Sequence, residues 1–374
     1  MSESTGVREY LSGNEALLQA VGLQPQSELH LEPLGKGEHN ENYLFGEEGA
    51  EARFVLRINR VPQPFHHTQV AYEYAALQAL EQSGCTPRPL YCDASAHALG
   101  KGVLVESFCA GSELDFDNLR PGDLQNVARL MANVHAVPVQ ENCPLFCPED
   151  PLRALFKECV DRFSVYKGTA FEDARYTRWI ERFLTATQNA IDACAPPQGA
   201  RHIINTETLP SHFLLPDKGK GEGEAEGEAP AAQAAPATQA APSAPAPATA
   251  TSGAFVDWER PILGEVAQDL AFFVAPSTTF WDSNYLFPHE DIQAFLDLYW
   301  QAVDKRFEKG SFEARFDAYL AVSVLRSQTW FCKNAARYAP TSEAQNAHTV
   351  QRTFDKWDIY TSDEFNEMLM HECF

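Results

Sequence analysis

Residues 218–253 interrupt the chain with a segment that cannot form a core of its own. They read KGKGEGEAEGEAPAAQAAPATQAAPSAPAPATATSG and contain no aromatic residue and no Val, Ile, Leu or Met. Such a composition cannot bury enough apolar surface to offset the entropy of ordering the backbone. Short apolar runs flank it directly, FLL at 213–215 and AFV at 254–256. We therefore predict a β-hairpin whose turn has been expanded into a long flexible insertion.

The rest of the chain has enough apolar residues for a large hydrophobic core. Of the 374 residues, 44% are hydrophobic and 11% are aromatic, which excludes global disorder. Acidic residues outnumber basic ones by 52 to 29, which gives a net charge of −23. This charge would repel a polyanion, so we expect no nucleic-acid partner. It would suit a cationic substrate, or it could simply keep the surface hydrated.

Cysteine usage and hydropathy indicate the compartment. The nine cysteines include no CxxC pair, and the odd number disfavours a framework of disulfides. The chain shows no basic-then-apolar leader and no apolar run of bilayer length. We expect a cytoplasmic protein without a membrane partner.

Hydrophobic periodicity divides the chain into a β-rich part and a helical part. The first part, residues 1–110, contains predicted strands at 28–34, 42–46, 53–58 and 102–108 and a predicted helix at 70–82. The second part, residues 111–374, contains predicted helices at 122–137, 151–168, 173–194, 290–308 and 312–338. A small β-rich lobe is thus expected to precede a larger helical lobe, and the insertion at 218–253 interrupts the latter.

Polar residues follow these elements in an informative order. A turn with two glycines joins the first two strands, a basic residue lies on the next strand, and a glutamate lies on the helix. Asp257 then follows the apolar run at 254–256, where its carboxylate could hold a divalent metal ion or could cap a turn. Kinase-type phosphoryl transfer needs these parts in this order.

With this order of parts, the chain resembles the aminoglycoside phosphotransferase and choline kinase-like family of small-molecule kinases. The resemblance runs from about Leu31 to about Tyr338. It implies an α+β, two-lobed protein-kinase-like fold, with a small β-rich N-lobe and a larger, mainly helical C-lobe. It also implies that ATP and Mg²⁺ are used to phosphorylate a hydroxyl group of a small molecule, an aminoglycoside, choline or sugar-like alcohol.

The resemblance assigns several N-lobe residues to the nucleotide. LGKGEHNENY at 34–43 looks like the turn that covers the phosphates, and FVLRI at 54–58 looks like the strand with the phosphate-pairing basic residue. VLVESF at 103–108 looks like the hinge whose backbone holds adenine. The residues thus implied in nucleotide binding are Gly35, Gly37, Asn40, Asn42, Arg57, Glu73, Glu106 and Phe108.

The C-lobe motifs match less completely. DWERPILGEVAQDLAFF resembles the segment with the metal-binding Asp, here Asp257, and a second, structural Asp, here Asp269. The family's catalytic loop, roughly H-G-D-L-H-P-G-N, falls on NTETLPSH at 205–212. Glu207 thus replaces the catalytic Asp, and His212 replaces the metal-binding Asn.

These replacements can be judged by their chemistry. Glu207 keeps a carboxylate that could orient or deprotonate an alcohol, but its extra methylene moves the oxygens by about 1 Å, and such a displacement can cost about a hundredfold in rate. His212 offers a nitrogen, whereas Mg²⁺ prefers oxygen. Arg57 keeps the positive charge of the usual Lys.

Three interpretations therefore stay open. The first is an active kinase with Glu207 as the catalytic residue and with Asp257 and His212 at the metal. The second is a catalytically impaired kinase-fold protein that binds nucleotide or a partner protein. The third is a pseudokinase that transfers a nucleotidyl group.

Overall fold

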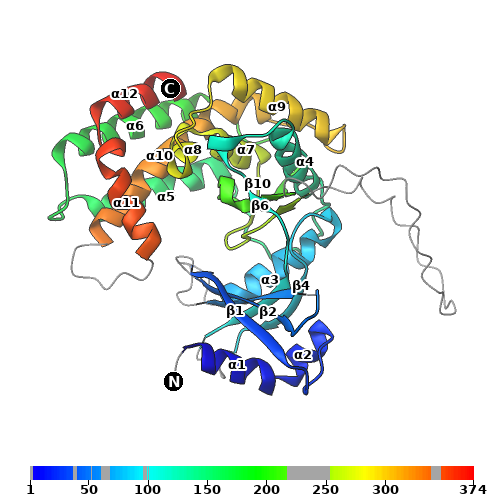
Figure 1. Ribbon diagram of the computed structural model, residues 1–374. Coiled ribbons are helices and arrows are strands. Elements are labelled where there is room, and N and C mark those ends of the chain that lie inside the picture. The colour runs from blue at the N-terminus through cyan, green and yellow to red at the C-terminus, as the bar shows by residue number, and fades with distance from the viewer. Residues whose placement is uncertain are drawn as a thin grey trace.

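The structure is a computed structural model that describes residues 3–36, 40–51, 53–59, 68–95, 99, 101–216, 253–337 and 347–374. The described chain forms a sheet-containing N-lobe and a larger, mostly helical C-lobe (Figure 1). This arrangement confirms the predicted α+β, two-lobed fold. Gly37 and almost all of the insertion lie outside the described residues.

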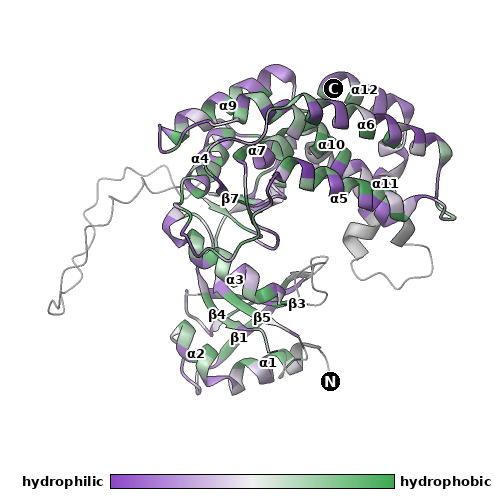
Figure 2. Ribbon diagram, turned by 180° about the vertical axis from the view of Figure 1, so that it is seen from behind, coloured by the Kyte–Doolittle hydropathy of each residue, from purple (hydrophilic) through white to green (hydrophobic). Residues whose placement is uncertain are grey.

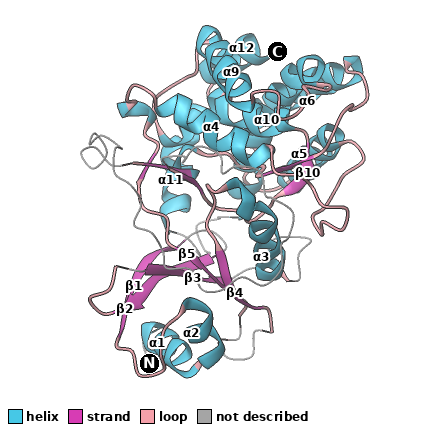
Figure 3. Cartoon of the chain, turned by 90° about the vertical axis from the view of Figure 1, so that its right-hand side faces the viewer, coloured by secondary structure: helices cyan, strands magenta, loops and turns pink. Residues whose placement is uncertain are grey.

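An antiparallel sheet of five strands forms the centre of the N-lobe. Its order is β1-β2-β3-β5-β4, with β1 at Leu29–Lys36, β2 at Asn40–Glu47, β3 at Arg53–Asn59, β4 at Pro89–Asp93 and β5 at Val103–Ser107. Helices α1 (Glu3–Gly13) and α2 (Glu15–Val21) cover one face, and α3 (Gln69–Leu80) lies on the side toward the C-lobe (Figures 1 and 3). Leu11, Leu17, Phe45 and Leu56 are fully buried between the sheet and α1 and α2.

The C-lobe is built around a long central helix. α10 (Phe312–Arg337) packs against α5 (Pro151–Tyr166), α6 (Ala174–Ala193) and α7 (Val266–Val274). The other helices are α4 (Asp123–His135), α8 (Pro276–Asp282), α9 (His289–Val303), α11 (Ala347–Tyr360) and α12 (Asp363–Cys373). Local sequence defines several helix starts: the Asp150 carboxylate accepts hydrogen bonds from the backbone N–H groups of Leu152 and Arg153, and Pro151 occupies the first turn.

Short strands position the loops between the lobes. β7 (His202–Ile204) pairs with β10 (Ile262–Gly264), while β8 (Phe213–Leu215) pairs with β6 (Ser112–Glu113) and β9 (Ala254–Phe255). Phe213 lies opposite Phe255 and Leu214 opposite Ala254, which confirms the predicted hairpin. The two ends of the insertion are therefore held side by side.

Hydropathy follows the packing. In the outer helices of the C-lobe, such as α6, α9 and α12, hydrophilic and hydrophobic residues alternate around the helix axis (Figure 2). Leu130 and Met131 of α4, Leu270 of α7 and Leu325 of α10 are fully buried in one core. None of the helices in the described part of the chain combines the length and apolar composition that a bilayer crossing requires.

Candidate active site

The loop at 205–212 connects β7 to β8, and the side chain of Asp269 holds the backbone at its start. This buried carboxylate accepts hydrogen bonds from the backbone N–H groups of Asn205 and Thr206, each at 2.8 Å. His135 holds the same carboxylate at 3.2 Å through Nε2 and contacts the Tyr299 hydroxyl at 2.9 Å through Nδ1. Asp269 is thus the structural carboxylate that the sequence predicted.

Two residues of the site have left-handed backbone conformations. The φ angle is +74° at Thr206 and +63° at Asp257. Such conformations cost about 1–3 kcal/mol at a non-glycine residue unless the surroundings enforce them. Here Arg326 donates to the Thr206 carbonyl, and Asn205 Nδ2 donates to the Asp257 carbonyl at 2.8 Å. These hydrogen bonds fix the backbone directly before Glu207 and at Asp257, which carry the two carboxylates of the predicted site.

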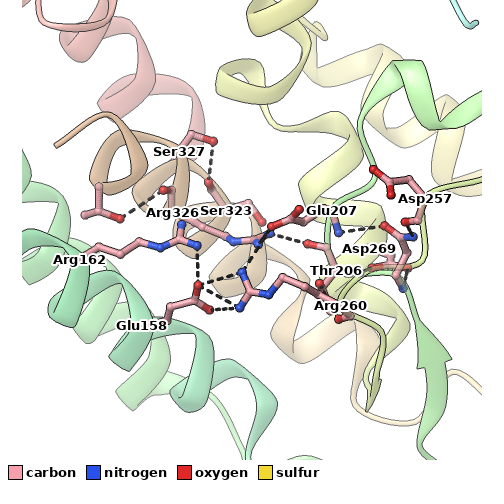
Figure 4. Close-up of polar contacts among 12 residues, drawn as sticks. Glu158, Arg162, Thr206, Glu207, Asp257, Arg260, Asp269, Ser323, Arg326 and Ser327 are labelled. Carbon is pink, nitrogen blue, oxygen red and sulfur yellow. Dashed lines mark hydrogen bonds and ion pairs between the residues drawn. The ribbon is translucent and has the colours of Figure 1, made fainter. Parts of the chain in front are cut away.

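Glu207 is held by arginines (Figure 4). Its Oε1 accepts a hydrogen bond from Arg326 of α10 and lies 3.5 Å from Nη1 of Arg260. Burial would raise the pKa of Glu207, but Arg326, Arg260 and Arg162 outweigh it and lower the pKa below its usual range. Glu207 is therefore an ionised, well-oriented group and a weak proton acceptor.

Arg57 joins the two lobes. Its Nη2 lies 3.0 Å from Glu73 of α3, 2.9 Å from Asp257 and 3.1 Å from Glu259. Asn40, at the start of β2, donates to the same Glu259 oxygen that Arg57 contacts. The site thus brings together four of the predicted residues, Asn40, Arg57, Glu73 and Asp257, and it adds Glu259.

The carboxylates around Arg57 outnumber the positive charge. Burial raises the pKa of Glu73 to about 8 and that of Glu106 to about 7, and Arg57 offsets this only in part. Burial, followed by the nearby Asp257, also raises the pKa of Glu259 well above its usual range. Such a cluster of oxygens is stabilised by an added cation.

The donor set fits Mg²⁺ bound together with phosphate. Mg²⁺ in nucleotide sites takes one or two carboxylates, and phosphate oxygens and water complete its coordination. Asp257 and Glu259 provide such carboxylates. Within the described ranges, no three His, Cys, Asp or Glu side chains form a complete metal site without added ligands. His212 Nε2 lies 3.3 Å from Asp257 Oδ2, so the imidazole contacts a predicted metal ligand.

Four other predicted nucleotide residues that the structure describes, Gly35, Asn42, Glu106 and Phe108, lie on the sheet or directly after β5. Gly35 pairs with Asn42 across β1 and β2, and Asn42 pairs with Arg57 across β2 and β3. Glu106 lies 4.0 Å from Arg57. The backbone N–H of Phe108 donates to the Arg53 carbonyl at 3.2 Å, so this donor is already used in the structure.

Several residues of the site were missed by sequence reasoning. Gln69 Nε2 donates to the Glu259 carbonyl and the Tyr72 hydroxyl to the Pro261 carbonyl, each at 2.5 Å, so α3 is tied to the segment after Asp257. The acidic character of DWE could have indicated Glu259. Nothing in the periodicity of α10 distinguishes Arg326 from a surface arginine.

Comparisons with known proteins show the family and the fold of this chain. The model of the "Phosphotransferase enzyme family" matches residues 30–223, more than half of the chain. No curated protein matches. An ethanolamine kinase from Plasmodium vivax is 11% identical, with a TM-score of 0.63 and coverage of 98% of this chain and 91% of that one.

Two further solved structures share the fold. A choline kinase from Cryptosporidium parvum is 13% identical, with a TM-score of 0.55 and coverage of 98% of this chain and 100% of that one. A spectinomycin phosphotransferase in complex with ADP and spectinomycin is 11% identical, with a TM-score of 0.55 and coverage of 91% and 93%, respectively. On this evidence the chain belongs to the phosphotransferase enzyme family and has its protein-kinase-like fold.

Proposed function

We propose that the protein is an ATP-dependent phosphotransferase that phosphorylates a hydroxyl group of a small molecule. The observation that carries the proposal is the meeting of Arg57, paired with Glu73, and Asp257 next to the 205–212 loop. Positioning and electrostatic stabilisation account for nearly all of phosphoryl-transfer catalysis, and this arrangement supplies both.

Each side chain has a role in this proposal. When bound, Mg·ATP supplies the transferable γ-phosphoryl group and a divalent charge for the carboxylates. Asp257 and Glu259 offer oxygen ligands to the metal, and His212 supports the metal site through its contact with Asp257. Arg57 binds the nucleotide phosphates, oriented by Glu73. The remaining residues assigned to the nucleotide are Gly35, Gly37, Asn40 and Asn42 in the covering turn and Glu106 and Phe108 at the adenine side.

Glu207 is proposed to orient the acceptor hydroxyl and to receive its proton late. Its lowered pKa makes it a weak base early in the reaction. A loose, metaphosphate-like transition state places little demand on a base, so orientation is the larger contribution.

The same contacts favour a second candidate, a nucleotide-binding protein with impaired catalysis. Arg326 and Arg260 both contact Glu207 Oε1, the atom that would receive the proton if that oxygen faced the acceptor. Such a protein would bind Mg·ATP without transferring its phosphoryl group.

One experiment separates these candidates. Thermal unfolding is measured with ATP, with and without Mg²⁺, and a panel of small alcohols is incubated with Mg·ATP and read by mass spectrometry. We expect Mg²⁺-dependent stabilisation by ATP and at least one phosphorylated alcohol. Binding without product would favour the impaired protein, a product heavier by a nucleotidyl group would favour the pseudokinase, and absence of nucleotide binding would refute the proposal.

Asp257→Asn provides the matched variant, because Asn keeps the size and tolerates a positive φ. It should remove the Mg²⁺-dependent part of ATP binding and leave the fold intact. Asp304→Asn is the control, since Asp304 also has a positive φ, +45°, at the end of α9. It should bind Mg·ATP like the parent.

A further inference from the structure

An arginine cluster lies beside Glu207. We define it as Arg162, Arg260 and Arg326 together with Glu158 and Glu207. Glu158 and Arg162 come from α5, Arg326 comes from α10, and Arg260 follows Glu259 in the segment after β9. In Figure 4, Glu207 lies between the rest of this group and Asp257. The guanidinium groups of the cluster are therefore on the side of Glu207 away from Asp257, a proposed metal ligand.

The two glutamates connect the arginines. Glu158 accepts from Arg162 and, at 3.2 and 3.3 Å, from Nη2 of Arg260. Glu207 accepts from Arg326 and lies 3.5 Å from Arg260. Arg162, Arg260 and Arg326 hold the pKa of Glu158 at about 2 against the opposing effect of burial. Both carboxylates are therefore ionised at neutral pH.

The cluster has an excess of positive charge. Counted over its five described members, three guanidinium groups face two carboxylates, although the whole chain has a net charge of −23. Arg162 and Arg326 have only 10% and 4% of their side chains exposed. Burial, with Arg326 and Arg260 nearby, lowers the pKa of Arg162 in spite of Glu158. An uncompensated buried charge is unfavourable, so a further anion would stabilise this group.

Unused donors remain in the cluster. A guanidinium has five N–H groups, which suit carboxylate and phosphate oxygens. In the described part of the chain Arg162 forms a single ion pair, to Glu158, and the buried Nε of Arg326 has no hydrogen-bond partner. The side chains of Arg260, Glu158 and Glu207 are 22%, 28% and 36% exposed, so solvent reaches the cluster at these three residues.

We infer that the acceptor alcohol carries an anionic group, a carboxylate or a phosphate, which binds to Arg260 and Arg162 while its hydroxyl lies near Glu207. This inference rests on the proposed function, since it identifies the substrate class of the same site. The negative charge of the whole chain suggested a cationic substrate, but the charge next to Glu207 is positive. Local charge decides recognition at contact distance, because exposed charges beyond about 8–10 Å are largely screened.

The test compares acceptors of similar size and different charge. Glycerol, ethanolamine, glycerate and glycerol 3-phosphate are each offered with Mg·ATP, and product formation is read by mass spectrometry. We expect kcat/KM for glycerate or glycerol 3-phosphate to exceed that for glycerol by about tenfold or more. The comparison of these two distinguishes carboxylate from phosphate. A preference for glycerol or ethanolamine overturns the inference.

Arg260→Met tests the assigned contact. It should raise KM for the anionic acceptor about tenfold or more, with the Mg²⁺-dependent stabilisation by ATP unchanged. Arg153→Met is the control from α5, because Arg153 is exposed and pairs with the exposed Asp192; it should behave like the parent. The inference is contradicted if Arg260→Met loses as much activity on glycerol as on the anionic acceptor, or if it binds ATP more weakly than the parent. Arg260→Lys, which keeps the charge, should have a KM for the anionic acceptor between those of the parent and of Arg260→Met.

A binding measurement separates this inference from the proposed function. Calorimetry with glycerate and with glycerol 3-phosphate, in the presence of Mg·ADP, needs no turnover. Arg260-dependent binding without phosphoryl transfer to any alcohol would support the anion site and refute the phosphotransferase. Phosphoryl transfer without any preference for anionic acceptors would support the phosphotransferase and refute the anion site.

Discussion

Arg57 and Asp257, separated by 200 positions in the sequence, lie 2.9 Å apart and join the sheet of the N-lobe to the segment after β9. Arg57 is 7% exposed and pairs at the same time with Glu73. Its guanidinium is therefore the counter-charge for carboxylates of both lobes, Glu73 in the N-lobe and Asp257 in the C-lobe. Burial alone would lower the pKa of Arg57, but these carboxylates raise it well above its usual value.

The first prediction concerns this centre. Arg57→Met should lower the free energy of unfolding by about 3 kcal/mol or more at neutral pH, because it leaves buried carboxylates without a counter-charge. Chemical denaturation provides the measurement. Arg53→Met on the same strand is the control, since Arg53 is exposed and lies over the Phe108 ring; its cost should stay below about 1 kcal/mol.

A double variant tests the cause of that loss. Arg57→Met with Glu73→Gln should be more stable than Arg57→Met alone, because Gln replaces a buried carboxyl that must take up a proton on folding once Arg57 is gone. If the double variant is less stable than the single one, the loss comes from packing and not from charge.

The second prediction concerns pH. The pKa of Glu106 rises from 4.5 to about 7 in the folded protein because the carboxyl is buried. A raised carboxyl pKa contributes stability that is complete below pH 4.5 and is lost as the pH rises to about 7. Glu106→Gln lacks this loss, so the parent should fall relative to it by up to about 1.4 kcal/mol per pH unit across that window.

Unfolding curves at a series of pH values measure this difference. Glu81→Gln, an exposed change next to α3, serves as the control for removing a surface carboxylate. Parallel stability profiles for the parent and Glu106→Gln would contradict the assignment of a raised pKa to Glu106.

The third prediction concerns the insertion. β8 and β9 pair directly, so a short turn can join them. Replacing residues 218–252 by a turn of about four residues should change the melting temperature by less than about 2 °C. A much larger loss would show that the insertion stabilises the body of the protein.

Gly253→Ala shows whether that assay can detect damage to the hairpin. Gly253 has a φ of +140°, and an added Cβ would lie 2.6 Å from the Leu214 carbonyl oxygen. This substitution should destabilise the protein by about 1–3 kcal/mol. Gly13→Ala, where a Cβ would meet nothing within 4 Å, is the matched control.

The elements that sequence predicted well have a clear period. The pattern of Phe312, Phe316, Leu320 and Val324 predicted a helix at 312–338, and α10 spans Phe312–Arg337. By contrast, α7 was missed because all nine of its residues are buried. A helix that is buried on every side has no polar face, so its sequence shows no amphipathic period.

The residues of the site also divide into those that the sequence could predict and those that it could not. Arg57 and Glu73 could be found because each has a fixed place in an ordered set of motifs. Arg326 could not, because its importance comes from the packing of α10 against the 205–212 loop. This packing brings it to Thr206 and Glu207, which are 120 and 119 positions away in the sequence. Contacts that tertiary packing creates leave no local pattern in the sequence.

The last prediction concerns the two unusual residues of the loop. Glu207 reaches Arg326 and Arg260, and His212 reaches Asp257, so both side chains have partners suited to their length. Glu207→Asp should therefore lower kcat by about a hundredfold, because the shortened carboxylate is displaced by about 1 Å. Glu207→Gln keeps the length and removes the charge, and thus separates position from charge. His212→Asn should shift the Mg²⁺ dependence of turnover toward higher concentrations, because Asp257 loses a partner that orients it.

The double change Glu207→Asp with His212→Asn decides how the loop is used. It restores the residue types of the family's loop, and it would raise kcat if the site were simply decayed. If the loop has adapted to Glu207 and His212, the double variant should be at least as slow as Glu207→Asp alone, since the partners on α10 and after β9 stay where they are. We expect this second result, measured as kcat on an acceptor that the alcohol panel identifies, with melting curves to exclude unfolding. An increase in kcat would show instead that Arg326 and Arg260 restrain Glu207 at the expense of turnover.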